Sequence, residues 1–255
     1  MEAVRGGERI VIYGDYDVDG ITATAILYHV LGVASPEQPP GWYVPNRLDE
    51  GYGLNPEALL KLRAEGADLV VSVDCGVTAA AAAATAREAG LDLIITDHHL
   101  PPAGDAALPN AVAIVHPSLP GSEYPFQELC GAGVAFKVAW AFARAWCGSE
   151  RVSKAFQEVL VRMLPMVALG TIADVVPLVG ENRVLAAHGL RSMRSTPMSG
   201  LQALIDRAGL RGARIDSDKV GFVLGPRLNA CGRLGHAADA IRLFTDADAT
   251  TSEAI

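Results

Sequence analysis

The sequence lacks the features of a secreted, membrane-spanning or disulfide-framed protein. It has only four cysteines in 255 residues and no Cys-x-x-Cys pair, which argues against a zinc cage and predicts reduced thiols. No uninterrupted apolar run approaches the roughly 18 to 20 residues that cross a bilayer, and the N-terminus has no signal-peptide pattern. We therefore expect a cytoplasmic protein with no membrane partner.

Positive charge is scarce overall but concentrated in one segment. The net charge is -8, which alone disfavours a nucleic-acid partner because phosphates attract basic surfaces. Residues 1–180 contain 11 Lys and Arg against 21 Asp and Glu, whereas residues 181–235 contain 9 against 4. This distribution suits a carboxylate metal site beside a surface that holds a polyanion. An unevenly charged, solvated helical surface is the alternative interpretation.

Short apolar runs alternate with helix-like segments in the first half of the chain. The runs that predict buried strands are residues 8–13, 42–44, 68–74, 91–97 and 112–116. Almost wholly apolar strands that alternate with helices are typical of a parallel sheet covered on both faces. We expect an α/β fold with a parallel five-stranded sheet flanked by helices, followed from about Gly131 by a mostly helical segment. Half of the residues are hydrophobic, which is enough for a large core.

Acidic and imidazole side chains follow three of the predicted strands. The sequence IVIYGDYDVDG places Asp15, Asp17 and Asp19 after the first clear strand, and Asp74 ends the strand at 68–74. The triplet at 97–99, Asp-His-His, ends the strand at 91–97. Ligands bind beyond the carboxyl ends of parallel strands, so these loops are expected to converge. Each aspartate taken singly is also explained as a helix cap or a loop charge.

The repeated aspartates predict a site for divalent cations. An EF-hand is excluded because the twelfth position of that loop is Ile26 instead of Glu, and a strand precedes the loop. Mixed carboxylate and imidazole ligands suit Mn²⁺, Mg²⁺ or a related ion. The acids outnumber the needs of one ion, which suggests a pair about 3.5 to 4 Å apart. Such a pair is typical of enzymes that hydrolyse phosphoesters.

Four segments resemble the successive motifs of the DHH phosphoesterase superfamily. They are GDYDVDGITA (14–23), VSVDCGV (71–77), TDHH (96–99) and GTIADVVPL (170–178). Within the superfamily the resemblance is greatest to RecJ-type exonucleases specific for single-stranded DNA. Further stretches support it in the same order, namely PNRLDEGYGL (45–54), LCGAGVAFK (129–137) and GPRLNACGRLG (225–235).

The resemblance implies a two-manganese hydrolase, with Mg²⁺ as the alternative metal. The implied metal ligands are Asp15, Asp17, Asp19, Asp74, His98 and Asp174. The first two would help to hold one ion, Asp19 with His98 and Asp174 the other, and Asp74 would bridge them. Asp97 would orient an imidazole by a hydrogen bond, while His99 would face the scissile phosphate as a donor or acid. Asp174 lies in the helical half, where the strand pattern alone indicates only a helix-terminal aspartate.

The stretch GPRLNACGRLG lies in the basic segment and is expected to contact substrate phosphate. Its Gly and Pro residues are expected to break the helix and let backbone amides approach a phosphate. Arg227 and Arg233 would supply forked donors and Asn229 a neutral one; an arginine pair that bridges domains is the alternative. A structural role is favoured for the remaining histidines, which are His29, His116, His188 and His236.

The resemblance also implies a domain organisation. We expect an α/β DHH subdomain at residues 1–130, a helical part at 131–236, and at 237–255 the start of a linker helix to a DHHA1 domain that this sequence lacks. The implied activity is a 5′-to-3′ exonuclease on single-stranded DNA in repair and recombination, with a single-strand-binding protein or a helicase as partner. Two alternatives remain open, a phosphatase or phosphodiesterase acting on small nucleotides or pyrophosphate, and a noncatalytic DHH module.

Overall fold

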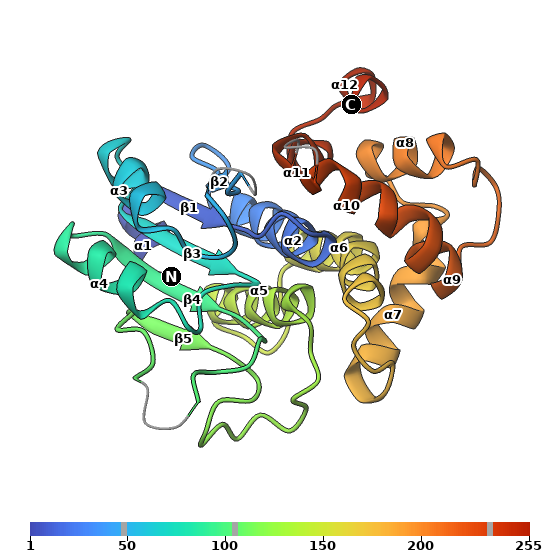
Figure 1. The fold of residues 1–255 in the computed structure, drawn as a ribbon. Helices are drawn as coiled ribbons and strands as arrows, with labels where there is room; N and C mark the ends of the chain where they lie inside the picture. The colour runs from blue at the N-terminus through green and yellow to red at the C-terminus, as the bar shows by residue number, and fades with distance from the viewer. Residues whose placement is uncertain (47–49, 104–106, 234–236) are drawn as a thin grey trace.

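The five predicted strands form one parallel sheet (Figure 1). The computed structural model describes residues 1–46, 50–103, 107–233 and 237–255, with the backbone alone described at Arg233. The strand order is β2-β1-β3-β4-β5. The strands are β1 (Ile10–Tyr13), β2 (Gly41–Tyr43), β3 (Leu69–Val73), β4 (Asp92–Thr96) and β5 (Ala113–Val115). The expectation of a parallel five-stranded α/β fold is confirmed.

The register of the sheet brings the carboxyl ends of its strands to one edge. Tyr13 of β1 is level with Ser72 of β3, Val73 of β3 with Thr96 of β4, and Thr96 with Val115 of β5. Every residue of β1 and β3 is buried because helices cover both faces of the sheet. The loops that carry the predicted site residues therefore leave the sheet side by side.

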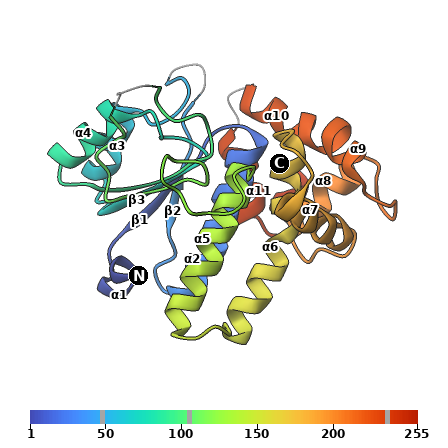
Figure 2. The same cartoon turned by 90° about the horizontal axis from the view of Figure 1, so that it is seen from below.

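Two pairs of helices cover opposite faces of the sheet (Figure 2). On one face lie α3 (Pro56–Ala64) and α4 (Ala80–Glu88), and on the other lie α2 (Val18–Ala34) and α5 (Gly131–Cys147). A short helix, α1 (Glu2–Gly6), precedes β1. The side chain of Asn55 caps α3 by accepting hydrogen bonds from the amides of Glu57 and Ala58.

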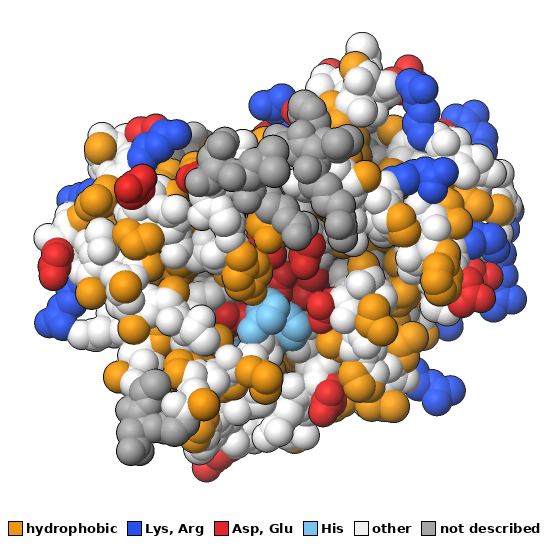
Figure 3. Space-filling model, viewed as in Figure 1, with side chains coloured by type: hydrophobic (Ala, Val, Ile, Leu, Met, Phe, Trp, Pro, Cys, Tyr) orange, Lys and Arg blue, Asp and Glu red, His pale blue; other side chains and the backbone are white. Residues whose placement is uncertain are grey.

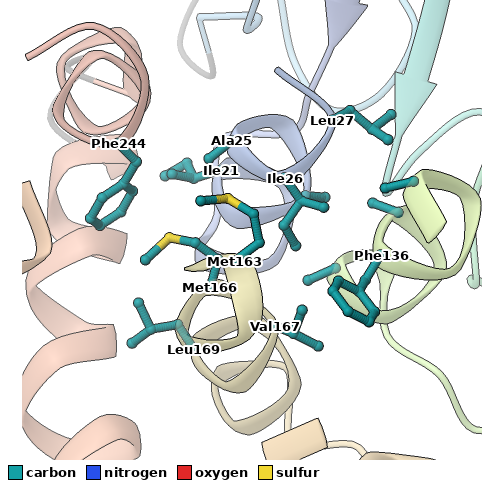
Figure 4. Close-up of a cluster of buried hydrophobic side chains, with 14 of the residues drawn as sticks. Ile21, Ala25, Ile26, Leu27, Phe136, Met163, Met166, Val167, Leu169 and Phe244 are labelled. Atoms are coloured by element: carbon teal, nitrogen blue, oxygen red, sulfur yellow. The ribbon is translucent and has the colours of Figure 1, made fainter. Parts of the chain in front are cut away.

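The larger core is centred on α6 (Lys154–Ala173), which packs against α2, α5 and α7 (Gly180–Met193). Met163, Met166 and Leu169 of α6 are buried among side chains of α2, α5 and α11 (Figure 4). By length and composition α6 is the one described helix that could cross a membrane, but 61% of its apolar window is buried inside the protein. The packing identifies α6 as a core helix.

The C-terminal part is helical, as expected from about Gly131 onwards. After α7 come α8 (Ser199–Arg207), α9 (Ser217–Lys219), the π-helix η1 (Val220–Leu224), α10 (Gly225–Arg233), α11 (Ala237–Thr245) and α12 (Ala249–Ala254). The segment 237–255, expected to start one long helix, forms two short ones. They separate because the Asp248 side chain accepts a hydrogen bond from the amide of Thr251 and starts α12.

The expectation that Gly225 and Pro226 break the helix is wrong. Both belong to α10, which continues directly from η1. Pro226 has no N–H to donate, and in the π-helical turn before it the Gly225 amide bonds to the Val220 carbonyl oxygen, so the helix continues past the missing bond. The amides of residues 225–233 therefore belong to a helix and not to a phosphate-binding loop.

Candidate metal centre

The loop after β1 delivers three carboxylates to the sheet edge. Asp15 is buried, and the side chain of Asp17 caps α2 by accepting a hydrogen bond from the amide of Gly20 at 3.0 Å. Because of this cap α2 begins at Val18, three residues before Ile21, where the apolar helix pattern starts. Asp19 lies in the first turn of α2 and is also buried. The local sequence thus gives alternate aspartates distinct positions around one helix N-terminus.

Asp19 is held by the N-terminus of a second helix, α5. Its carboxylate accepts hydrogen bonds from the amides of Gly131, at 2.5 Å, and Ala132, at 2.9 Å. Amides at a helix N-terminus and the helix dipole both favour a negative group. The sequence stretch LCGAGVAFK suggested only a family resemblance, so this contact was missed. These hydrogen bonds between Asp19 and the start of α5 connect the α/β half of the chain to its helical half.

Asp74 follows β3 in a strained conformation and faces His98 from the neighbouring strand end. The backbone of Asp74 is left-handed, with φ 62°. Asp74 Oδ1 lies 3.1 Å from His98 Nε2, and neither buried atom forms a hydrogen bond of acceptable geometry with a described residue. Buried polar atoms are normally satisfied, so these two atoms are placed to share one cation as ligands.

Asp97 organises the other histidine of the triplet. Its Oδ1 is 2.8 Å from His99 Nδ1 and accepts a hydrogen bond from the His98 amide, and its Oδ2 accepts one from the amide of Val77. Burial raises the pKa of Asp97, but these hydrogen bonds outweigh burial and hold it below its ordinary value. The hydrogen bond to Asp97 in turn raises the pKa of His99. His116 Nε2 is 2.7 Å from the His99 carbonyl oxygen, a supporting position consistent with its expected structural role.

Asp174 completes the cluster from the helical half of the chain. It caps the C-terminus of α6, and Val175 directly after it has a left-handed backbone with φ 61°. Asp174 Oδ2 and Asp19 Oδ2 each lie 3.7 Å from His98 Nε2. Asp74 and Val175 are the non-glycine residues with positive φ in the described backbone. Strain of this kind concentrates at functional sites.

The six sequence-predicted metal ligands therefore meet at one place. Three overlapping groups could each hold an ion, with ligand atoms all within 4.8 Å of one another. The groups are Asp15 with Asp17 and Asp74, Asp19 with His98 and Asp174, and Asp74 with His98 and His99. The acids and histidines gather in a central hollow of the surface (Figure 3). The geometry brings together all the residues that the sequence suggested for this site.

Burial and mutual repulsion raise the pKa values of these acids. Burial, followed by the charges of Asp174 and Asp17, raises the pKa of Asp19 to about 7. Burial and the charge of Asp17 raise the pKa of Asp174 to about 6, and burial with Asp19 raises that of Asp74. Burial lowers the pKa of His98 to about 4, which leaves its imidazole neutral. Divalent cations would remove the repulsion, and neutral imidazole is the form that binds metal.

The donor set fits oxygen-preferring divalent ions. Carboxylates with an imidazole suit Mn²⁺, Mg²⁺ and related metals, and no cysteine thiol belongs to any of the three groups. Gly131 and Gly170 have no side chain, which leaves room for the carboxylates of Asp74 and Asp19. A Cβ atom at Gly131 would lie 2.5 Å from Asp74 Oδ1, and one at Gly170 would clash with Asp19 Oδ1. The residues present thus match a two-ion site in charge, donor chemistry and shape.

Tyr52 is a site residue that the sequence reasoning did not single out. Its hydroxyl oxygen is 3.2 Å from His99 Nδ1, and its ring meets the rings of Tyr16 and His99 edge to face. The side chain is 55% exposed and lies at the rim of the cluster. Tyr52 lies in the stretch PNRLDEGYGL, which indicated only a family resemblance, and the fold of residues 50–55 brings its side chain to the site.

The residues predicted to contact phosphate are only partly brought to the site. Asn229 Oδ1 accepts a hydrogen bond from the amide of Val18, next to Asp17, at 3.2 Å. Arg227 is exposed, donates to the Val223 carbonyl oxygen, and lines a separate hollow with residues of α8 and α12. The side chain of Arg233 and all of His236 lie outside the described residues. Of the predicted phosphate ligands that are described, Asn229 alone adjoins the metal cluster.

The fold and the site define a parallel α/β protein with an acidic, imidazole-containing metal-type site at the carboxyl edge of its sheet. The model of the DHH family, N-terminal domain, matches residues 9–171. The chain therefore belongs to the DHH family.

Known relatives agree with this assignment over almost the whole chain. The single-stranded-DNA-specific exonuclease RecJ of Bacillus subtilis (strain 168) is 42% identical over 252 residues, which are 99% of this chain and 30% of that protein. The RecJ of Escherichia coli (strain K12) is 39% identical over 251 residues, covering 95% of this chain and 42% of that protein. The chain thus spans less than half the length of these curated relatives.

Solved structures show the same fold. A crystal structure of exonuclease RecJ bound to manganese is 37% identical and superposes with a TM-score of 0.84, covering 99% of this chain and 60% of that chain. A crystal structure of RecJ from Thermus thermophilus in complex with Mn²⁺ is 35% identical with a TM-score of 0.80, covering 99% of this chain and 34% of that chain.

Proposed function

We propose that this chain is the catalytic core of a metal-dependent exonuclease that hydrolyses phosphodiesters of single-stranded DNA. The observation that carries the proposal is the meeting of Asp74 and His98 at the centre of three overlapping ligand groups. The names of the relatives support single-stranded DNA as the substrate. A 5′-to-3′ direction and a role in DNA repair and recombination belong to the same proposal.

Two Mn²⁺ ions are the proposed cofactors, with Mg²⁺ as a substitute. Asp15 and Asp17 would hold one ion, Asp19 with His98 and Asp174 the other, and Asp74 would bridge them. Crystal structures of related RecJ proteins contain Mn²⁺ or Mg²⁺, which supports this choice. When bound, such a pair would neutralise phosphoryl oxygens and make water easier to deprotonate.

Side chains of this protein would orient the substrate and donate a proton to it. Asp97 would orient the ring of His99 through the 2.8 Å contact at Nδ1. His99 Nε2, which lies 3.3 Å from the Tyr52 hydroxyl, would then face the scissile phosphate. The raised pKa of His99 keeps that imidazole protonated to higher pH, so it can donate a hydrogen bond or a proton to a phosphate oxygen. Asn229 is proposed to contact the phosphate beside the cut, and the same role for Arg227 and Arg233 stays a prediction.

The domain organisation and cellular setting complete the proposal. Residues 1–130 would form the α/β subdomain, 131–236 the helical part, and 237–255 the start of a connection to a further domain. A single-strand-binding protein or a helicase is the proposed partner, and the cytoplasm is the proposed location. Relatives much longer than this chain support the existence of further domains in the family.

One assay tests the activity. The protein is incubated with 5′-labelled single-stranded DNA, duplex DNA or pyrophosphate, in Mn²⁺, Mg²⁺ or chelator, alongside Asp74→Ala. We expect metal-dependent cutting of the single strand that the substitution abolishes. Turnover of pyrophosphate without cutting of DNA would replace the proposal with a small-phosphate hydrolase, and inactivity without metal binding would indicate a noncatalytic module.

A further inference from the structure

A row of arginines lies along one face of α7, outside the metal centre. Arg183, Arg191 and Arg194 are spaced by eight and three residues, which places them on the same side of an α-helix. All three are exposed. In Figure 3 the Lys and Arg side chains of the C-terminal part lie at the edge of the molecule, whereas the acids and histidines occupy the central hollow. The Lys and Arg side chains at that edge are therefore separate from the acids and histidines of the metal centre.

The far end of this row opens into a hollow of about 500 Å³. Arg191 and Arg194 line it from α7, and Arg214 and Ile215 line it from the segment between α8 and α9. Asp216 is the one acid in the lining, and it is already engaged, since it caps α9 and lies 3.3 Å from Lys219 Nζ. The hollow therefore has a clear excess of positive charge.

The arginines of the hollow have no carboxylate partner within the described part of the chain. The guanidinium groups of Arg191, Arg194 and Arg214 form neither an ion pair nor a hydrogen bond with a described residue, whereas Arg63, Arg144 and Arg211 are each paired with an acid. Arg191 and Arg194 are also like charges three residues apart, which repel one another on a helix. Three forked donors around one hollow form a phosphate-binding arrangement.

We propose that this hollow binds the phosphate backbone of a nucleic-acid strand whose end occupies the metal centre. The N-terminus of α7 is tied to the site, because the Asn182 amide group donates to the carbonyl oxygen of Pro177, three residues after Asp174. Arg191 follows Gly180 by eleven residues, or about 16 Å at 1.5 Å per residue. The hollow therefore lies about three helical turns along α7 from the loop that follows Asp174. The inference rests on the proposed function for the identity of the strand, but it concerns binding and not cleavage.

The test compares two doubly substituted proteins that lose the same charge. R191Q/R194Q removes two arginines of the hollow, and R87Q/R151Q removes two exposed arginines, in α4 and in the α5–α6 loop, that also lack ion pairs with described residues. Binding of a long labelled oligothymidylate is measured by fluorescence anisotropy in chelator, where nothing is cut, at several salt concentrations. Loss of two contacts, each contributing about 0.7 to the salt slope, predicts a slope lower by about 1.4 and affinity about 25-fold weaker near 0.1 M salt.

The two sources of phosphate are separated by competition. Inorganic phosphate, matched in phosphate concentration to unlabelled oligothymidylate, should fail to displace the probe if the site binds a strand. Equal displacement would assign the hollow to free phosphate and overturn the proposal. Equal weakening in both double variants, unchanged binding in R191Q/R194Q, or no binding by the unsubstituted protein would also overturn it.

Stability measurements exclude a purely structural explanation. Arginines near a helix C-terminus also interact favourably with the helix dipole, and that role alone predicts a lower melting temperature with unchanged binding. If R191Q/R194Q fails to fold, R214Q removes a hollow arginine outside any helix, and it should weaken binding about fivefold. If the unsubstituted protein cuts no DNA but R191Q/R194Q still binds the strand more weakly, the proposed function is refuted and the proposal for the hollow stands.

Discussion

Asp74 Oδ1 lies 3.1 Å from His98 Nε2, and the two residues stand just beyond the ends of adjacent strands. Asp74→Asn keeps the shape of the side chain and tolerates the left-handed backbone, but it removes the charge that two ions would share. We expect Mn²⁺ affinity, measured by calorimetry, to fall at least about 100-fold. The free energy of unfolding of the metal-free protein should rise by roughly 1–3 kcal/mol, because a repelling charge is lost.

The combination of weaker metal binding and a more stable metal-free protein is the signature to look for. Asp92→Asn is the matched control, since Asp92 is an exposed acid at the start of β4. It should change neither quantity by more than about 0.5 kcal/mol. A destabilised metal-free Asp74→Asn protein would show that Asp74 serves the fold and not an ion.

Metal affinity should depend on pH through Asp19 and Asp174. Their pKa values of about 7 and about 6 mean that both acids carry protons near pH 6, and an ion must displace those protons to bind. Apparent Mn²⁺ affinity should therefore rise at least about tenfold from pH 6 to pH 8. His98, with a pKa of about 4, stays neutral across this range and adds no slope.

Calorimetry in buffers of different ionisation enthalpy checks this directly. At least one proton should be released per protein at pH 6, and fewer at pH 8. Proton release near zero at both pH values would mean that the acids of the cluster are ionised before the ion arrives.

His99 should affect catalysis more than metal binding. His99→Ala is expected to lower kcat about 100-fold, the usual contribution of a general acid, while Mn²⁺ affinity changes little. Asp97→Asn removes the negative charge beside His99 Nδ1 that helps to raise the pKa of His99, so the fall in activity at high pH should move to lower pH. A large loss of Mn²⁺ affinity in His99→Ala would instead make His99 a metal ligand beside Asp74 and His98.

Gly131 should be intolerant of even one added carbon. In Gly131→Ala the new Cβ would meet Asp74 Oδ1 at 2.5 Å, so the carboxylate or α5 must move. We expect a loss of about 1–3 kcal/mol in the free energy of unfolding together with weaker Mn²⁺ binding. Gly32→Ala in α2 is the control, because no atom lies within 4 Å of its added Cβ. That change should be neutral or stabilising by up to about 1 kcal/mol.

The sheet and its acidic edge could be predicted from sequence because both follow from short-range patterns. Runs such as Leu69–Val73 are apolar on both faces, which indicates a doubly covered parallel strand, and parallel strands end together by necessity. The convergence of the loops carrying Asp15, Asp74 and Asp97 then follows from topology. No knowledge of side-chain packing is needed for that step.

The contributions of the helical half could not be predicted in this way. Asp174 reaches the cluster because α6 packs against α2 and α5, a tertiary arrangement with no local signal. The continuation of helix through Gly225 and Pro226 depends on the π-helical turn before them, which residue propensities do not reveal. Tyr52 and the α5 amides around Asp19 likewise depend on how separate segments meet.

The left-handed backbone at Val175 lowers the stability of the protein but holds Asp174 in position for catalysis. A branched side chain tolerates φ 61° poorly, and the valine side chain is 84% exposed, so little packing compensates for the strain. Glycine at this position would relax the joint and make the protein more resistant to heat. It would also let the neighbouring carboxylate of Asp174 move away from the metal cluster. Glycine here would therefore raise thermal stability and lower the catalytic rate.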